Sequence, residues 1–160
     1  MLRGTDSHDN LIGKGGPDTL LGLGADDCLE GGTGPDSVEG GPGNDGIRGG
    51  PTVGHCGAPR QERPGASDVL SGGPGKDVVD GAAGADTISG GDGDDFFFDG
   101  ENHGGAIDVL SGGAGDDILL TYNRPARKDV VSCGGGHDEV FADRADVVSG
   151  DCERVHRHLP

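Results

Sequence analysis

Gly31-Gly32-Thr33-Gly34-Pro35-Asp36-Ser37-Val38-Glu39 is followed directly in the chain by Gly40-Gly41-Pro42-Gly43-Asn44-Asp45-Gly46-Ile47-Arg48. Both blocks have nine residues, with Gly at positions 1, 2 and 4, Asp at position 6 and a large apolar residue at position 8. Gly adopts positive φ without strain, so positions 1 to 6 suit a tight turn. Positions 7 to 9 suit a short strand with one inward side chain. The period therefore predicts repeated units of turn and strand.

The same frame runs through most of the chain and defines fourteen repeats. Position 6 holds fourteen of the 23 Asp residues: Asp9, Asp18, Asp27, Asp36, Asp45, Asp68, Asp77, Asp86, Asp95, Asp108, Asp117, Asp129, Asp138 and Asp146. Position 8 is always large and apolar: Leu11, Leu20, Leu29, Val38, Ile47, Leu70, Val79, Ile88, Phe97, Leu110, Leu119, Val131, Val140 and Val148. Leu, Ile, Val and Phe together make up 32 of the 160 residues, so agreement at fourteen places indicates a genuine repeat.

The composition alone resembles that of a disordered chain. It contains 36 Gly, 31% hydrophobic residues and a formal charge of −17, and such chains bury too little apolar surface to fold unaided. The negative charge argues against nucleic acid and anionic membranes as partners and favours bound cations. No apolar run is long enough to span a membrane or to form the core of a signal peptide. Any fold therefore needs help beyond a hydrophobic core.

The nonapeptide G-G-x-G-x-D-x-U-x resembles the calcium-binding repeat of the repeats-in-toxin (RTX) family over residues 4–151. The resemblance implies an all-β fold, a parallel β-roll or right-handed β-solenoid, with calcium ions between stacked turns. Two repeats make a coil of 18 residues, so fourteen repeats predict about seven coils bridged by Ca²⁺. Residues 152–160 are expected to form a C-terminal tail.

Alternate turns of such a roll lie on opposite edges, which we call the odd edge and the even edge after the repeat number. The irregularities all fall on the even edge: insertion 51–64, smaller insertions near 99–106 and 121–128, and a short turn before Asp146. The odd edge is thus predicted to hold an unbroken file of ions at Asp27, Asp45, Asp77, Asp95, Asp117 and Asp138. On the even edge we expect one good site between the turns of Asp18 and Asp36 and a partial site at Asp86, and at the first odd turn Asp9 is expected to be a weak terminal half-site.

Calcium suits these turns better than magnesium does. It accepts six to eight oxygen ligands from carboxylates and carbonyls with loose geometry, whereas Mg²⁺ demands a tight octahedron. Stacking also brings Asp close to Asp along each edge, so without a cation the carboxylates within each row repel one another. We therefore expect folding to be coupled to calcium binding.

Other polar residues carry a plainer expectation. The sequence shows no catalytic motif, and the GxGxxG match at Gly41–Gly46 leads straight into further repeats, so we expect no enzyme activity. For seven of the nine Asp residues outside position 6 we expect solvated side chains, namely Asp80, Asp92, Asp94, Asp99, Asp116, Asp143 and Asp151. Phe97 should point inward, leaving Phe96 and Phe98 as a contact patch or as the base under insertion 99–106.

The four cysteines favour an oxidising compartment over a zinc site, because their number is even and no CxxC motif occurs. Cys133 and Cys152 would lie in stacked turns of one edge, one coil apart, so a disulfide between them is expected. Their surroundings also resemble the closing segment of exported bacterial RTX proteins. Cys28 and Cys56, the latter in insertion 51–64, could form a second bridge, although their spacing gives it no support.

The predicted function is calcium binding by a secreted or surface-displayed β-roll, although this chain contains no signal sequence. Two settings stay open. The chain is either the C-terminal module of a larger secreted protease, lipase or phosphatase, or a stand-alone structural or adhesive surface protein with an unidentified protein or cell-surface partner.

Overall fold

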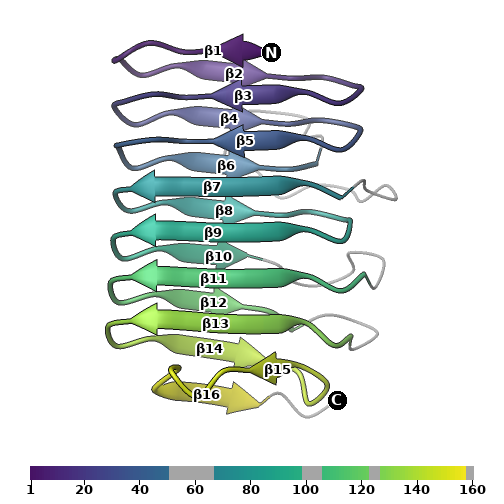
Figure 1. Cartoon of the computed structure of the whole chain (residues 1–160), viewed down its shortest axis with the longest axis vertical. Coiled ribbons are helices and arrows are strands. Elements are labelled where there is room, and N and C mark those ends of the chain that lie inside the picture. Colours follow the sequence, from purple (N-terminus) through teal and green to yellow (C-terminus); the bar gives the residue numbers. More distant parts are fainter. Residues whose placement is uncertain (51–66, 99–105, 123–126, 158–160) are drawn as a thin grey trace.

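The computed structural model describes residues 1–50, 67–98, 106–122 and 127–157. Within these ranges the chain contains strands and turns and no helix. The strands stack as two parallel sheets, with odd-numbered strands in sheet A and even-numbered strands in sheet B (Figure 1). The expected all-β, parallel β-solenoid is therefore confirmed.

Sheet A has eight strands, in the spatial order in which they occur in the chain. They are β1 (Leu2–Arg3), β3 (Thr19–Leu21), β5 (Ser37–Glu39), β7 (Val69–Pro74), β9 (Thr87–Asp92), β11 (Val109–Ala114), β13 (Val130–Gly135) and β15 (Val147–Val148). Sheet B also has eight strands. They are β2 (Asn10–Ile12), β4 (Cys28–Glu30), β6 (Gly46–Arg48), β8 (Val78–Asp80), β10 (Phe96–Phe98), β12 (Ile118–Leu120), β14 (Glu139–Ala142) and β16 (Arg154–Arg157).

Every strand pairs with the strand two places along the chain, so each coil adds one strand to each sheet. The register keeps position 8 aligned: Leu20 pairs with Val38, and Val38 pairs with Leu70 across insertion 51–64. The fourteen repeats thus build about seven coils, as expected, with β1 and β16 adding a further strand at the two ends.

The core is the column of position-8 side chains between the two sheets. Twelve of the fourteen are at most 2% exposed, whereas Leu11 and Val148 are partly buried because they lie in end coils that have a neighbour on one side. Phe97 is fully buried, Phe96 is half-buried and Phe98 is 36% exposed, as the alternation predicts. The core is one side chain thick, so the turns must supply much of the stability.

The last four odd-edge turns, on the left in Figure 1, are themselves part of the sheet. β7, β9, β11 and β13 are six residues long because they continue into positions 1 to 3 of the following turn. Positions 2 and 4 have positive φ, as at Gly91 (125°) and Gly93 (141°). A Cβ at Gly93 would lie 1.5 Å from the Gly75 carbonyl oxygen, so this position requires glycine.

The C-terminal segment differs from the expected tail. β16 pairs in parallel with β14, placing Val155 beside Val140 and Arg154 beside Glu139. His156 Nε2 donates a hydrogen bond to Glu139 Oε1 at 2.7 Å, and the His156 ring stacks on Phe141, with ring centroids 4.7 Å apart. The solenoid therefore continues beyond residue 151.

Candidate metal sites

The position-6 aspartates form two continuous hydrogen-bond ladders, one along each edge. In each ladder the backbone amide of one Asp donates to Oδ1 of the Asp one coil further on, over 2.6–3.1 Å. The bond from Asp36 to Asp68 is 2.8 Å long although 32 residues separate the two. Asp at position 6 thus joins adjacent coils whether or not an insertion lies between them.

These carboxyl groups are buried. All except Asp9 and Asp18 are at most 5% exposed. Burial, which disfavours the charged form, raises the pKa of Asp45, Asp68 and Asp95 to about 6 and the pKa of Asp77, Asp86 and Asp117 to about 7. Neighbouring Asp charges in the same ladder add to the effect. A buried row of carboxylates is costly unless a cation compensates it.

The second carboxylate oxygen distinguishes the aspartates from one another. Oδ2 is buried and has no hydrogen-bond partner among the described residues in nine of them: Asp18, Asp27, Asp36, Asp45, Asp77, Asp86, Asp95, Asp117 and Asp138. Asp9 Oδ2, in contrast, accepts hydrogen bonds from the Thr5 amide (2.6 Å) and the Thr5 hydroxyl (3.0 Å). Asp146 Oδ2 accepts hydrogen bonds from the Thr121 hydroxyl (3.1 Å) and the Asp143 amide (2.7 Å).

Seven of the unpartnered oxygens face a backbone carbonyl of the next turn; the exceptions are Asp86, and Asp138, whose turn begins with Cys133 instead of glycine. A Cβ built on Gly90 would lie 2.1 Å from Asp95 Oδ2 and 2.7 Å from the Gly112 carbonyl oxygen of the next turn. Both oxygens therefore border the space above the first residue of the turn, which glycine leaves open. Carboxylate and carbonyl oxygens are the ligands that calcium prefers. Since no cluster of three or more His, Cys, Asp or Glu side chains is found in the described ranges, backbone carbonyls would supply much of each ligand set.

A family model for the RTX calcium-binding nonapeptide repeat matches four segments of the chain, residues 3–38, 26–51, 65–97 and 104–122. Together the segments cover more than half of the sequence. The chain belongs to the RTX calcium-binding repeat family. Searches of curated proteins and of solved structures return no match. The RTX repeats imply calcium binding by a structural β-roll, and the described part of the chain includes no helix that could span a membrane.

The sequence-predicted residues of this RTX chain are brought together edge by edge. Asp27, Asp45, Asp77, Asp95, Asp117 and Asp138 follow one another along the odd edge, one per coil. Asp18 and Asp36 are joined on the even edge, and Asp86 lies further along it between Asp68 and Asp108. Insertion 51–64, most of insertion 99–106, part of insertion 121–128, Asp99 and Cys56 lie outside the described residues.

Sequence reasoning missed a second row of hydrogen bonds along the odd edge, at position 5. Here the bonds run in the opposite direction: the Asn44 amide donates to Asp26 Oδ1 (2.8 Å) and the Lys76 amide to Asn44 Oδ1 (2.9 Å). Further on, the Asp116 amide donates to Asp94 Oδ1 (3.1 Å). The sequence contained a signal for this row: position 5 is polar in these odd-edge turns, whereas on the even edge it is Pro17, Pro35 and Ala85, whose side chains cannot accept such bonds.

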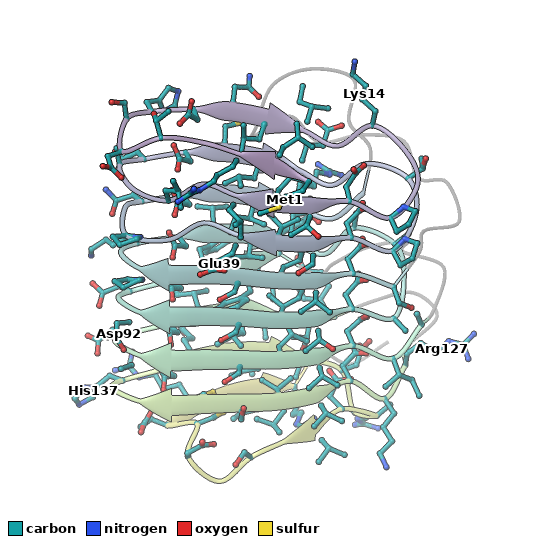
Figure 2. The ribbon with its side chains drawn as sticks, turned by 45° about the horizontal axis from the view of Figure 1, so that its top comes forward. Met1, Lys14, Glu39, Asp92, Arg127 and His137 are labelled. Carbon is teal, nitrogen blue, oxygen red and sulfur yellow. A yellow bond between two sulfur atoms is a disulfide. The ribbon has the colours of Figure 1, made fainter. Side chains whose placement is uncertain are left out.

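Two of the Asp residues expected to be solvated are not. Asp143 is 5% exposed, and its amide donates to Asp146. Asp80 forms an ion pair with Arg48 at 3.1 Å on the outer face of sheet B. By contrast, Asp92 is exposed at the odd edge, the same edge as His137, while Lys14 and Arg127 lie at the opposite edge (Figure 2). Asp94 is also exposed and pairs with Lys76.

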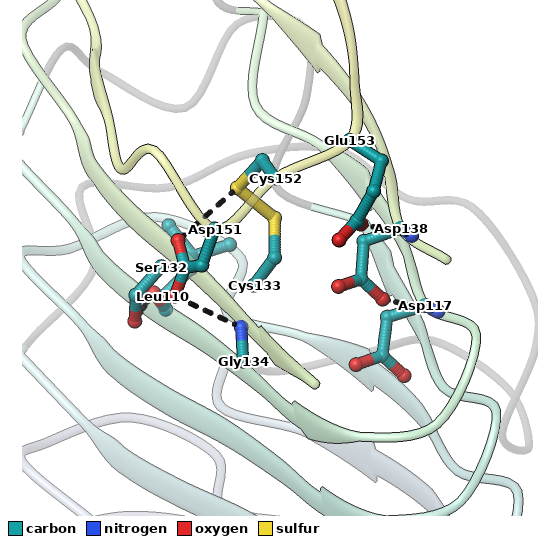
Figure 3. The surroundings of a disulfide bond; sticks show 9 residues. All are labelled: Leu110, Asp117, Ser132, Cys133, Gly134, Asp138, Asp151, Cys152 and Glu153. Carbon is teal, nitrogen blue, oxygen red and sulfur yellow. Dashed lines mark hydrogen bonds between the residues drawn. A yellow bond between two sulfur atoms is a disulfide. The ribbon is translucent and has the colours of Figure 1, made fainter. Parts of the chain in front are cut away.

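The C-terminal end of the RTX solenoid is closed by the predicted disulfide. Cys133 and Cys152 are bonded, with their Cα atoms 5.1 Å apart (Figure 3). On the even edge, Arg157 donates to the carbonyl oxygens of Asp143 (2.6 Å) and Asp146 (3.1 Å). A guanidinium and a hydroxyl thus satisfy the last even turn, where unpartnered carboxylate oxygens occur in the complete turns.

Proposed function

We propose that this protein is an extracellular calcium-binding β-roll whose folding depends on calcium. The observation that supports this most directly is the set of nine buried Asp Oδ2 atoms without a hydrogen-bond partner in the described structure. A native protein rarely leaves such oxygens unsatisfied, and a divalent cation compensates both their charge and their lost hydration. Calcium, once bound, supplies this compensation.

The distribution of these oxygens supports different roles for the two edges. Six occur on consecutive odd turns, and three occur on the even edge at Asp18, Asp36 and Asp86. We therefore propose a file of ions along the odd edge, one site between the turns of Asp18 and Asp36, and a partial site at Asp86. Asp9 would be weak, because Thr5 already occupies its Oδ2.

Coupling of folding to calcium follows from the balance of forces in one coil. Each coil buries two position-8 side chains, while it orders about 18 residues, many of them glycine, at roughly 1–2 kcal/mol each. The raised pKa values of the buried aspartates mean that the fold itself disfavours their ionised state. Ions that bind only the folded turns shift the equilibrium toward the roll.

An extracellular location is supported by the Cys133–Cys152 disulfide, since such bonds persist in oxidising compartments. A calcium-dependent fold also suits export, because the chain would stay unfolded where free calcium is scarce. The strong negative charge disfavours nucleic acid as a partner.

The test is a far-UV circular dichroism titration of the oxidised protein with CaCl₂ and, in parallel, MgCl₂, starting from metal-free solution. We expect β-structure to form cooperatively with calcium and much less with magnesium. Elemental analysis after dialysis against calcium should find several ions per chain. Full β-structure in excess chelator would refute calcium-dependent folding, and absence of bound calcium would refute the function.

A further inference from the structure

The turn that follows β15 is shorter than any complete repeat, yet it restores the odd-edge frame. Position 8 recurs at Val148 and Val155, seven residues apart instead of nine. The pairing of Glu139 with Arg154 places Glu153 beside Asp138, which is position 6 of the preceding odd turn. Glu153 therefore occupies the slot that Asp fills in the other odd turns.

Glu153 also makes the bond that defines this slot. The Asp138 amide donates to Glu153 Oε2 at 2.9 Å, as the Asp117 amide donates to Asp138 Oδ1 at 2.9 Å. Figure 3 shows Asp117, Asp138 and Glu153 one above the other, with their carboxylates on the same side of the backbone. Asp138 is fully buried, and its Oδ2 has no partner in the described structure. The buried Asp138 carboxyl group and the exposed Glu153 carboxylate thus lie in consecutive turns at the end of the file.

A second side chain of the short turn replaces a missing backbone contact. In complete turns the position-2 amide donates to the carbonyl of the next turn, as Gly41 does to Gly72 (2.8 Å). At the last turn the Gly134 amide donates instead to Asp151 Oδ2 at 3.2 Å. Asp151 is thereby engaged with Gly134, which leaves Glu153 as the acidic group that faces Asp138.

The disulfide holds Asp138 and Glu153 in register. Cys133 is the first residue of the turn that ends at Asp138, and Cys152 directly precedes Glu153. The bond therefore ties the start of the Asp138 turn to the residue before Glu153 in the short turn (Figure 3). Without it, the short turn would have to be positioned by hydrogen bonds alone.

We propose that Asp138 and Glu153 form a terminal calcium site, completed by backbone carbonyls of the short turn that follows β15 and preorganised by the disulfide. The site extends the odd-edge file by one ion beyond the last complete repeat. This inference rests on the proposed calcium-binding function. Its ligand is a glutamate from outside the nonapeptide pattern, one methylene longer than Asp and so able to reach the Asp138 amide from a shortened turn.

The test compares the oxidised parent protein with Glu153→Gln and with Glu39→Gln, an exposed glutamate on β5 that serves as the matched control. Calcium bound per chain is counted by elemental analysis after dialysis against saturating calcium. We expect one ion fewer for Glu153→Gln and an unchanged count for Glu39→Gln. An unchanged count and an unchanged calcium titration for Glu153→Gln would overturn the terminal site, whereas a parent protein without calcium would overturn the proposed function instead.

If Glu153→Gln fails to fold in saturating calcium, a Cys133→Ser/Cys152→Ser variant provides the second measurement. It keeps Glu153 but removes the tether. We expect the weakest step of its calcium titration to require about tenfold more calcium, because the two turns are no longer held at high effective concentration. A calcium titration identical to that of the oxidised parent would contradict the preorganised site.

Discussion

The two edges of this roll use the same residue for different purposes. On both, Asp at position 6 accepts the amide of the preceding coil through Oδ1. On the odd edge from Asp27 onward, Oδ2 has no hydrogen-bond partner among the described residues at any turn, whereas near the end of the even edge Thr121, Asp143 and Arg157 satisfy the turn of Asp146. The first oxygen builds the fold, and the second determines whether a turn offers a ligand to a metal.

The edges also differ in how the turn backbone is held. The odd-edge turns of Asp77, Asp95, Asp117 and Asp138 are paired through positions 1 to 3, and position 5 of this edge carries the second row of bonds. The even edge has proline at position 5 in two of its three full-length turns, those of Asp18 and Asp36, and so lacks that donor there. The insertions occur on this edge.

The substitution with the largest expected effect on this difference between the edges is Gly93→Ala, in an odd-edge turn. Gly93 has φ 141°, and a Cβ there would lie 1.5 Å from the Gly75 carbonyl oxygen. We expect the substitution to destabilise the calcium-bound roll by more than the ~1–3 kcal/mol of backbone strain alone, because the stacked turns must also separate. Urea unfolding in saturating calcium measures the change.

Gly135→Ala is the matched control, since it lies at position 3 of another odd turn and a Cβ added there would meet no atom within 4 Å. It should change the unfolding free energy by no more than about 0.5 kcal/mol. Equal effects of the two substitutions would show that close stacking of odd turns does not stabilise the protein.

Asparagine substitution at position 6 should have smaller effects than Gly93→Ala, and these effects should differ between the two edges. Asp77→Asn keeps the Oδ1 acceptor for the Asp45 amide but loses the charge of an unpartnered Oδ2. We expect the calcium midpoint of folding to rise roughly tenfold, which corresponds to ~1.4 kcal/mol. Circular dichroism during calcium titration checks this.

Asp146→Asn should behave differently, because Thr121 and Asp143 already bond to its Oδ2. We expect a loss of about 1–3 kcal/mol from broken hydrogen bonds to a charged group, with the number of bound ions unchanged. A lower ion count in Asp146→Asn would mean that the even edge binds metal where its turn is closed by protein groups.

The smallest expected effect concerns pH, and the two edges should respond to it in the same way. Burial raises the pKa of Asp77 and Asp117 on the odd edge, and of Asp86 on the even edge, to about 7. The folded state therefore holds protons that the unfolded state has released, so the stability of the metal-free protein is greatest below about pH 4 and falls as the pH rises through 6–7.

The measurement is far-UV circular dichroism of metal-depleted protein between about pH 4 and pH 8, a range that spans the unfolded and folded pKa values. We expect β-structure to increase on acidification, and Asp77→Asn to differ little from the parent at the acidic end, where the carboxyl groups are neutral. With calcium the dependence should reverse, because the ion requires carboxylates. More β-structure at the alkaline end than at the acidic end without metal would contradict the burial of these groups.

The periodic part of the sequence predicted most of the fold. Position 8 identified Leu20, Val38 and Phe97 as core residues, and the phase of the repeat brought Cys133 and Cys152 into stacked turns. These inferences succeeded because each coil repeats the geometry of the one before it. Once the frame is known, a residue's position in it determines which way its side chain points.

Predictions from the repeat failed where the nine-residue spacing is interrupted. Glu153 could not be assigned to position 6, because the last turn is two residues shorter than a complete repeat and its register is visible only in the pairing of β14 with β16. The expected solvation of Asp143 was wrong for the same reason, since the short turn before Asp146 folds it inward. The position-5 row was missed because its residue types vary, with Asp26, Asn44 and Asp94 performing one role.

The ladder that joins Asp36 to Asp68 has a consequence for how such chains can diversify. Its length, 2.8 Å, equals that of the bond from Asp18 to Asp36, although the first spans 32 residues and the second 18. The number of residues between two rungs is therefore independent of the distance between coils. Even-edge turns can accept new peptide segments, for recognition or for engineering, while the odd edge keeps the scaffold unchanged.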